Sequence, residues 1–227
     1  MIQVGQGYIK VNDVMGDDLK VVNTARLSFA GSSNSLEDKD KKLIRYLAAN
    51  KHMSPFRGCF VTFEIEMPLF VKYQWIKHII GGEYQFKDTQ FNEVSRRYTS
   101  KNINTWWPKA WREQSEDNKQ ASVKADWDEY RVNAADSMYF NAIQTCLHAY
   151  DGLIAAGVCR EQARAVLPEA TYTKVVWTAG LQAITNFIEL RDHPHAQQEI
   201  RDYAVAMKEL VTPLFPTSME ALLDANK

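Results

Sequence analysis

Apolar and polar residues alternate most regularly between positions 59 and 67. Every second residue there is apolar, namely Cys59, Val61, Phe63, Ile65 and Met67. The residues between them are mainly polar, and this period of two predicts a strand with one buried face. Residues 8–11 and 19–22 are also rich in residues that favour strands, so we expect short strands near the N-terminus.

Apolar residues at helical spacing predict helices over residues 41–50, 125–151, 160–167, 173–190 and 195–211. The helix over 125–151 is expected to bury a stripe formed by Tyr130, Ala134, Met138, Ala142 and Cys146. The last dozen residues are expected to be peripheral. Since no linker interrupts the pattern, we predict one α+β domain over residues 1–227, with an antiparallel sheet and long helices.

Two residues of the predicted helix near 173–190 stand out on a helical wheel, where Gly180 and Arg191 fall inside the apolar sector. A glycine there permits close approach of another group. An arginine there must find an anion or carbonyl oxygens, because an unpaired buried charge is very costly. The alternative is a cation at the helix C-terminus. Arg164 is similarly open to two interpretations, as an anion partner or as a pairing residue within its helix.

Residues 68–98 carry the most informative polar pattern. A helix is predicted from Pro68 to the glycines at 81 and 82, because proline suits a first helical turn and glycine ends helices. Its apolar stripe consists of Leu69, Tyr73, Ile76 and Ile80. Its polar face consists of Gln74, Lys77 and His78.

The segment 92–98 follows this helix. If the segment is extended, Glu93, Ser95 and Arg97 point to one side. A carboxylate, a hydroxyl and a guanidinium in a row suit a phosphorylated, hydrogen-bonding ligand, with solvated surface as the alternative. The irregular residues 99–124 contain several tryptophans, for which a packed surface loop is favoured over a ligand-binding aromatic patch.

The composition is that of an ordinary globular protein, with 45% hydrophobic and 24% charged residues among 227. A net charge of −1 provides no basic field for nucleic acid, and no apolar run is as long as a membrane span. Cys59, Cys146 and Cys159 are too widely spaced for a disulfide framework or a zinc site, so we expect no metal and a reducing, cytoplasmic location. The N-terminus has no cationic start followed by an apolar core, so we expect no signal peptide.

Several segments share the order and spacing of motifs found together in one known family. They are residues 25–29, 52–56, 74–79, 92–98, 161–168, 172–173, 186–191 and 196–201. Together they resemble the flavin-dependent thymidylate synthases, whose signature is Arg-His-Arg, seven residues and Ser, followed by Arg-Tyr. The resemblance covers roughly residues 20–212, and several motifs in the right order are far more specific than one.

The resemblance implies a reaction and its partners. The family converts dUMP to dTMP, with methylenetetrahydrofolate as the carbon donor and NADPH as the source of hydride, which passes through FAD. It forms homotetramers whose FAD and dUMP sites combine more than one subunit. No side-chain nucleophile is required in the usual account of the family, so the protein binds, orients and stabilises charge.

The resemblance also implies roles for individual residues. Arg191 corresponds to the arginine beside the uracil ring, where a cation stabilises negative charge on the pyrimidine, and it is the catalytic candidate. The dUMP positions are Gln74, Lys77, Glu93, Ser95, Arg97, Arg164 and Arg191, of which Arg97 and Arg164 suit the phosphate. The FAD positions are Ser28, Ser54, Lys77, His78, Ile79, Asn92, Glu93 and Asn186. Ser95 is expected to donate or accept hydrogen bonds, because no histidine is placed by sequence to activate it as a nucleophile.

The chain departs from the family pattern mainly on the FAD side. Family residues are replaced here by Lys77, Ile79, Gly180 and Gln182. The spacing between Ile79 and Ser95 is fifteen residues instead of seven, and residues 54–58 replace Thr-Pro-Phe-Glu-His. Arg57 and Lys87 are candidates to restore the lost positive charge.

Two other functions remain open at this point. A related flavin- and folate-dependent enzyme would produce a hydroxymethylated pyrimidine nucleotide, if the long loop 81–91 reshapes access of water. A nucleotide-binding protein that has lost flavin and catalysis is the third possibility, and a yellow purified protein would argue against it.

Overall fold

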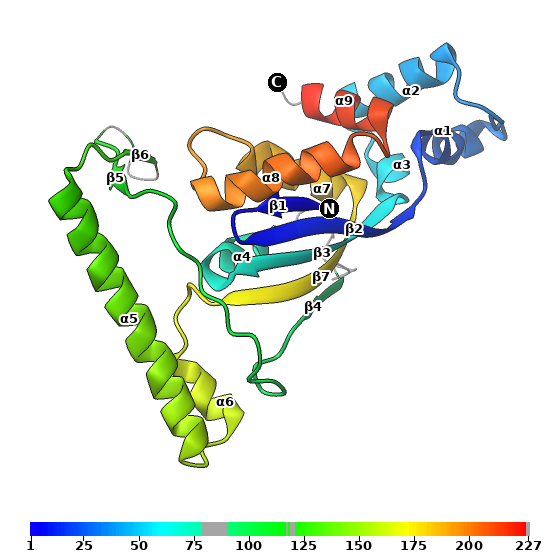
Figure 1. Ribbon diagram of the computed structural model, residues 1–227. Coiled ribbons are helices and arrows are strands. Elements are labelled where there is room, and N and C mark those ends of the chain that lie inside the picture. Colours follow the sequence, from blue (N-terminus) through cyan, green and yellow to red (C-terminus); the bar gives the residue numbers. More distant parts are fainter. Residues whose placement is uncertain (79–89, 117, 119–120, 226–227) are drawn as a thin grey trace.

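The sheet at the centre of the molecule is antiparallel and combines strands from both halves of the chain (Figure 1). The computed structural model describes residues 1–78, 90–116, 118 and 121–225. The strands of this sheet are, in spatial order, β1 (Ile2–Val4), β2 (Gly7–Met15), β3 (Phe60–Pro68), β7 (Tyr172–Gly180) and β4 (Gln90–Glu93). A separate hairpin joins β5 (Arg112–Gln114) to β6 (Ser122–Lys124). The predicted α+β class with an antiparallel sheet is confirmed.

The two middle strands, β3 and β7, pair along their whole length, from Phe60 opposite Gly180 to Pro68 opposite Tyr172. The fully buried side chains of β3 are Val61, Phe63, Ile65 and Met67. Between them, polar residues such as Thr62 and Glu64 are half-buried on the other face. An antiparallel sheet commonly has one core face and one polar face, so the strand predicted from the alternation at 59–67 is confirmed.

The remaining elements are helical. They are α1 (Asp18–Arg26), η1 (Leu27–Phe29), α2 (Asp38–Ala49), α3 (Ser54–Arg57), α4 (Leu69–Trp75), α5 (Glu129–Ala155), α6 (Arg160–Ala163), η2 (Arg164–Val166), α7 (Leu181–Arg191), α8 (Gln198–Val211) and α9 (Pro216–Asp224). Helices α4, α7 and α8 contact the sheet, whereas α1, α2, α3 and α9 gather at the end where β2 leads into α1 (Figure 1).

The helix predicted over 173–190 is wrong in its first half. Residues 172–180 form β7, which is paired with β3 on one side and with β4 on the other, and only residues 181–191 are helical. The segment is rich in β-branched and aromatic residues, and pairing with two neighbours overrides the pattern on the helical wheel. Gly180 is the N-cap residue of α7, where an added Cβ would meet only ordinary contacts, so the expected close approach is also wrong.

The strand predicted over 19–22 is wrong as well, because these residues belong to α1. The Asp17 carboxylate accepts a hydrogen bond from the Lys20 backbone N–H at 2.7 Å and caps the helix. Val21 and Val22 then turn inward and are fully buried. Asp17, which precedes the apolar segment 19–22, therefore favours a helix over a strand there.

Helix α4 is shorter than predicted and buries a different stripe. It ends at Trp75, and its buried residues are Val71 and Trp75, whereas the predicted Tyr73 and Ile76 are exposed. The Trp75 ring packs against the Phe187 ring, with centroids 4.2 Å apart, and this contact sets the rotation of the helix. Ile80 and the two glycines lie outside the described residues.

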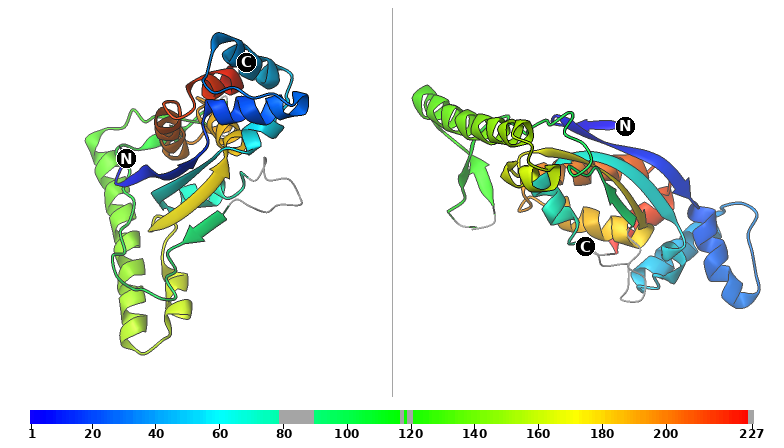
Figure 2. Two further views of the ribbon diagram at one scale, coloured as in Figure 1. Left: turned by 90° about the vertical axis from the view of Figure 1, so that its right-hand side faces the viewer. Right: turned by 90° about the horizontal axis from the view of Figure 1, so that it is seen from below.

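Helix α5 extends along one end of the molecule, away from α7, α8 and α9 (Figures 1 and 2). The stripe predicted to be inward is not a core face, because Tyr130 and Met138 are 85% and 68% exposed. Contact with the rest of the chain involves Tyr139, whose hydroxyl donates to the Trp106 carbonyl at 2.7 Å and whose ring packs against Trp106, Trp107 and Trp111. These tryptophans pack against α5 and also line a cavity of about 620 Å³, so both interpretations of this loop stand. In the described part of the chain, no helix is both long and apolar enough to cross a membrane.

The C-terminal segment is not peripheral, contrary to expectation. Phe215 and Met219 are buried, and α9 packs against α2 and α7. The buried Asp18 carboxylate accepts the backbone N–H of Thr217 at 2.7 Å and that of Ser218 at 3.0 Å. A side chain near the N-terminus thus satisfies the first turn of the last helix, a long-range contact that sequence spacing does not reveal.

We expect Asp18→Ala to destabilise the protein by about 2–4 kcal/mol, because the substitution leaves buried donors of α9 unsatisfied. The midpoint of urea unfolding, followed by circular dichroism, measures this change. Asp126→Ala, which removes an exposed aspartate, is the matched control and should change stability by about 0.5 kcal/mol or less. Equal midpoints for the two variants would contradict the role assigned to Asp18.

Candidate active site

A cavity of about 700 Å³ opens where the start of α4, the end of β4, the start of β7 and η2 meet. Four residues predicted to bind the nucleotide line it, namely Glu93, Ser95, Arg97 and Arg164. The extended geometry predicted for 92–98 is wrong beyond Glu93, because β4 ends there and the Tyr98 N–H closes a turn onto the Ser95 carbonyl at 3.0 Å. The turn still brings these side chains to one cavity, which we call the nucleotide cavity.

Glu93 is held in the nucleotide cavity by two donors that were not identified from the sequence. The Lys72 ammonium lies 2.6 Å from Oε2 of Glu93, and the Thr173 hydroxyl donates to Oε1 at 2.7 Å. Lys72 belongs to α4 and Thr173 to β7. In the sequence, Lys72 was visible only as a polar residue next to a motif and Thr173 only as part of the motif at 172–173, and tertiary structure was needed to bring them together.

The arginines that line the nucleotide cavity are of two kinds. Arg96 donates to the backbone carbonyls of Lys101 and Asn102 at 2.7 and 3.1 Å, and burial lowers its pKa, so it fixes the loop. Arg97 contacts neutral oxygens, and Arg164 forms no ion pair within the described residues. Two guanidinium groups without a carboxylate partner therefore face a cavity in which an anion can bind.

Arg191 and His78 contact each other outside the lining of the nucleotide cavity. The Nε of Arg191 donates to Nε2 of His78 at 2.7 Å, which leaves the imidazole hydrogen on Nδ1. Burial, and then the charge of Arg191, lower the pKa of His78 to about 4, so this imidazole is neutral at pH 7. Arg191 is also the last residue of α7, so its cation lies at a helix C-terminus, as one of the two interpretations expected.

The structure places the other predicted residues near α4, β4 and α7. Gln74 donates through its amide to the Gln197 side chain, and Lys77 and Asn92 are exposed. Like Arg191, neither Gln74 nor Lys77 lines the nucleotide cavity. Ile79 lies outside the described residues. One chain thus brings Arg97 and Arg164, which are expected at the phosphate, together with Glu93 and Ser95, whereas Gln74, Lys77, His78 and Arg191 lie outside the lining of this cavity.

A second cavity, of about 810 Å³, contains Ser28 and Ser54, two of the predicted FAD positions. Arg26, Lys39 and His52 also line it. Its volume is within the usual range for cofactor sites, and its hydroxyl, imidazole and cationic groups suit the phosphates and hydroxyls of a dinucleotide. The residues present therefore fit part of FAD.

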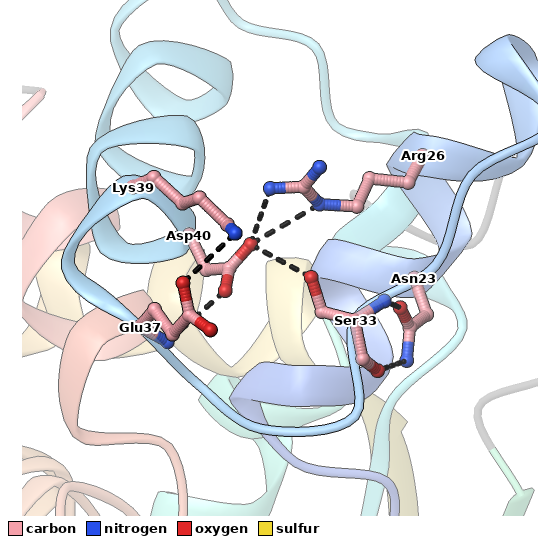
Figure 3. A network of polar contacts seen from close by, with 6 residues as sticks. All are labelled: Asn23, Arg26, Ser33, Glu37, Lys39 and Asp40. Carbon is pink, nitrogen blue, oxygen red and sulfur yellow. Dashed lines mark hydrogen bonds and ion pairs between the residues drawn. The ribbon is translucent and has the colours of Figure 1, made fainter.

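One wall of this second cavity is fixed by a polar network around the buried Asp40 (Figure 3). Arg26 donates twice to Oδ1 of Asp40, at 3.1 and 2.5 Å, and the Ser33 hydroxyl donates to the same oxygen at 3.0 Å. Burial by itself raises the pKa of Asp40, but the Glu37 backbone N–H, together with Arg26 and Ser33, outweighs this effect and lowers it. Asn23 exchanges two hydrogen bonds with the Ser33 backbone, so the loop between α1 and α2 is tied at both ends.

Arg57 lies beside Gln182, one of the positions at which the chain departs from the family pattern. The Nε of Arg57 donates to Oε1 of Gln182 at 2.7 Å. This contact follows from the strand pairing, because Phe60 opposite Gly180 brings α3 next to the start of α7. The Arg57 guanidinium thus lies next to Gln182. This position is required if Arg57 restores the positive charge that the chain lacks there. Lys87, the other candidate, lies outside the described residues.

The fold is that of an α+β protein with an antiparallel sheet, and a cavity with an excess of cationic side chains lies at the start of β7. The family described as "Thymidylate synthase complementing protein" matches residues 10–217. The flavin-dependent thymidylate synthase of Thermosipho melanesiensis is 35% identical over 97% of this chain and 92% of its own length. That of Thermus thermophilus is 36% identical over 95% of this chain and 75% of its own. This chain therefore belongs to the family of flavin-dependent thymidylate synthases.

A solved structure shows the same fold. The UMP/dUMP methylase PolB from Streptomyces cacaoi, bound with 5-Br UMP, is similar with a TM-score of 0.82 and 26% identity, over 97% of this chain and 95% of the other. A second structure of that enzyme, bound with 5-Br dUMP, gives the same TM-score at 28% identity, over 96% of this chain and 95% of that one. The resemblance seen in the sequence motifs is thus confirmed at the level of family and fold.

We expect the pKa of His78 to lie near 4 when it is titrated by NMR. The imidazole of the unfolded chain takes up its proton near the ordinary value of 6.5, whereas the folded chain resists protonation until about pH 4. The contribution of His78 to stability is therefore complete above pH 6.5 and is lost as the pH falls towards 4.

Arg191→Gln is the matched variant for this titration. It should raise the pKa of His78 only part of the way, because burial is the larger cause of the shift and remains. A pKa of 6.5 or more for His78 in the unsubstituted protein would contradict the contact with Arg191.

Proposed function

We propose that this chain converts dUMP to dTMP, with methylenetetrahydrofolate as the carbon donor and NADPH as the reductant acting through FAD. The observation that supports this most directly is the nucleotide cavity, where Glu93, Ser95, Arg97 and Arg164 meet on a chain of the flavin-dependent thymidylate synthase family. A related enzyme of the same fold binds 5-Br dUMP. A cavity of about 700 Å³ is of a suitable size for a nucleotide.

Arg97 and Arg164 bind the phosphate of the nucleotide in this proposal. Both line the cavity without a carboxylate partner among the described residues, and a guanidinium forms paired hydrogen bonds with phosphate. Ser95 and Glu93 provide hydrogen bonds to the rest of the nucleotide. The Ser95 oxygen accepts from the backbone N–H and the Nε of Arg97, and no histidine contacts it in the described part of the chain, which supports a binding role over a nucleophilic one.

Arg191 stabilises negative charge that develops on the pyrimidine. Its Nε is occupied by the neutral His78, which orients the guanidinium without cancelling its charge. The terminal nitrogens of Arg191 have no partner within the described residues and remain able to donate to a ligand. Such a donor, held partly out of water, stabilises a transition state more strongly than one in solvent. Gln74 and Lys77 complete the proposed dUMP site.

FAD, when bound, supplies the hydride chemistry that connects NADPH to the pyrimidine. The proposed residues that hold it are Ser28, Ser54, Lys77, His78, Ile79, Asn92, Glu93 and Asn186. Ser28 and Ser54 lie in the second cavity, whose wall is fixed by Arg26 and Asp40, and this rigid wall favours cofactor binding.

The functional unit in this proposal is a homotetramer with sites shared between subunits. Among the residues that the structure describes, none is shared by the nucleotide cavity, the Arg191–His78 pair and the cavity of Ser28 and Ser54. Large apolar side chains are also exposed, among them Tyr130 and Met138 on α5 and Phe29, which is 89% exposed, at the second cavity. Contact between copies of this chain would cover such surfaces and bring the partial sites together.

The purified protein, incubated with dUMP, FAD, NADPH and methylenetetrahydrofolate, is expected to yield a product heavier by one methylene unit, measured by mass spectrometry. A hydroxymethylated product would instead assign the chain to a related pyrimidine hydroxymethylase. A colourless protein that binds dUMP without turnover would contradict catalysis and leave a binding function.

Arg97→Ala and Arg164→Ala should each weaken dUMP binding by about 10- to 100-fold, the effect of losing a charge-assisted hydrogen bond. Binding of deoxyuridine, which has no phosphate, should change much less, and calorimetric titration measures both ligands. Arg45→Ala is the control, because Arg45 is an exposed arginine paired with Glu220 and does not line the nucleotide cavity. Equal losses for dUMP and deoxyuridine would place the phosphate elsewhere.

A further inference from the structure

The nucleotide cavity contains an ion pair between Lys72 and Glu93 that the motifs do not include. Its two side chains are only 15% and 28% exposed, and their charged atoms are 2.6 Å apart. The Thr173 hydroxyl donates to the other oxygen of Glu93, so the carboxylate is held at both ends. Since charges interact more strongly away from water, this pair is more than a surface contact.

Lys72 is placed for this contact by the ends of three elements. It is the middle residue of α4, whose start is tied to the sheet because the Leu69 N–H donates to the Thr171 carbonyl at 3.0 Å. Glu93 is the last residue of β4 and is paired with Val175 of β7. The backbone of these elements therefore brings the Lys72 ammonium and the Glu93 carboxylate together at the edge of the cavity.

The charges of the cavity lining support a role for this ion pair in binding. Its cations are Lys72, Arg96, Arg97 and Arg164, and its carboxylates are Glu93 and Glu161. Counted over the described residues, four positive and two negative groups leave an excess of two positive charges, which matches the charge of a phosphate monoester near neutral pH. Without Lys72, the excess falls to one, and Glu93 becomes a partly buried anion close to the phosphate.

We propose that Lys72 is a positioning residue of the nucleotide site, which holds Glu93 in place and cancels its repulsion of the substrate phosphate. Each carboxylate oxygen of Glu93 has one protein donor and can accept a second hydrogen bond, so the fixed carboxylate still receives a hydroxyl of the nucleotide. Lys72 acts through Glu93 and needs no contact with the nucleotide. This inference rests on the proposed function.

The test is calorimetric titration of the full-length, FAD-saturated protein with dUMP and with deoxyuridine. Lys72→Met should weaken dUMP binding by about tenfold, whereas deoxyuridine binding changes by about threefold or less. Lys72→Arg should retain dUMP binding, because the cation remains. Adding Glu93→Gln to Lys72→Met should return the ratio of dUMP to deoxyuridine affinity to its original value, because the repelling charge is gone.

The control is Lys10→Met, which breaks a similar lysine–glutamate pair, Lys10 with Glu64 at 3.1 Å, outside the cavity. It should leave the affinity for dUMP unchanged. Lys72→Gln is a second neutral variant, and thermal unfolding of every variant shows that it is folded. Unchanged dUMP binding in the folded neutral variants, or equal losses for dUMP and deoxyuridine, would overturn the role of Lys72. If the unsubstituted protein binds no dUMP, the proposed function itself is contradicted. If it binds dUMP and the neutral Lys72 variants bind it equally well, only the role of Lys72 is contradicted.

Discussion

The pairing of β3 with β7 is the contact on which both halves of the candidate site depend. At one end of this pairing, Pro68 lies opposite Tyr172, so the start of α4 is next to the start of β7, and Lys72 is brought near Thr173. At the other end, Phe60 lies opposite Gly180, which brings Arg57 to Gln182. Because each strand of this pair leads into a helix, the register between two strands sets the positions of side chains that are more than a hundred residues apart.

Charged side chains in this molecule are divided between structural contacts and free donors. Arg26 is bound to the buried Asp40, and Arg96 is bound to backbone carbonyls, so both hold loops in place. Arg97 and Arg164 have no carboxylate partner within the described residues. This division matters for function, because a cation already paired with a carboxylate gains little from a second anion, whereas an unpaired one at a cavity binds phosphate strongly.

Four of the residues that the sequence suggested for the nucleotide line one cavity, although the geometry first assigned to three of them was wrong. Glu93, Ser95 and Arg97 were predicted to share one side of a strand, but the strand ends at Glu93 and a turn places the other two. The motif therefore indicated which residues lie together. The hydrogen bonds of the turn determine how their side chains are arranged. Segment 172–180 shows the converse error, because a strand paired on both sides has a nearly continuous apolar pattern that a helical wheel also accepts.

The sequence by itself determined the strand at 60–68, the α+β class and the family, and it named four residues that meet at the nucleotide cavity. These depend on local alternation and on motifs whose spacing is written along the chain. Only the tertiary structure showed that Lys72 and Thr173 hold Glu93, that His78 is neutral beside Arg191, and that Asp18 completes the last helix. The physical reason is that burial and hydrogen bonding between distant segments depend on strand register and helix packing, which no local pattern of residues contains.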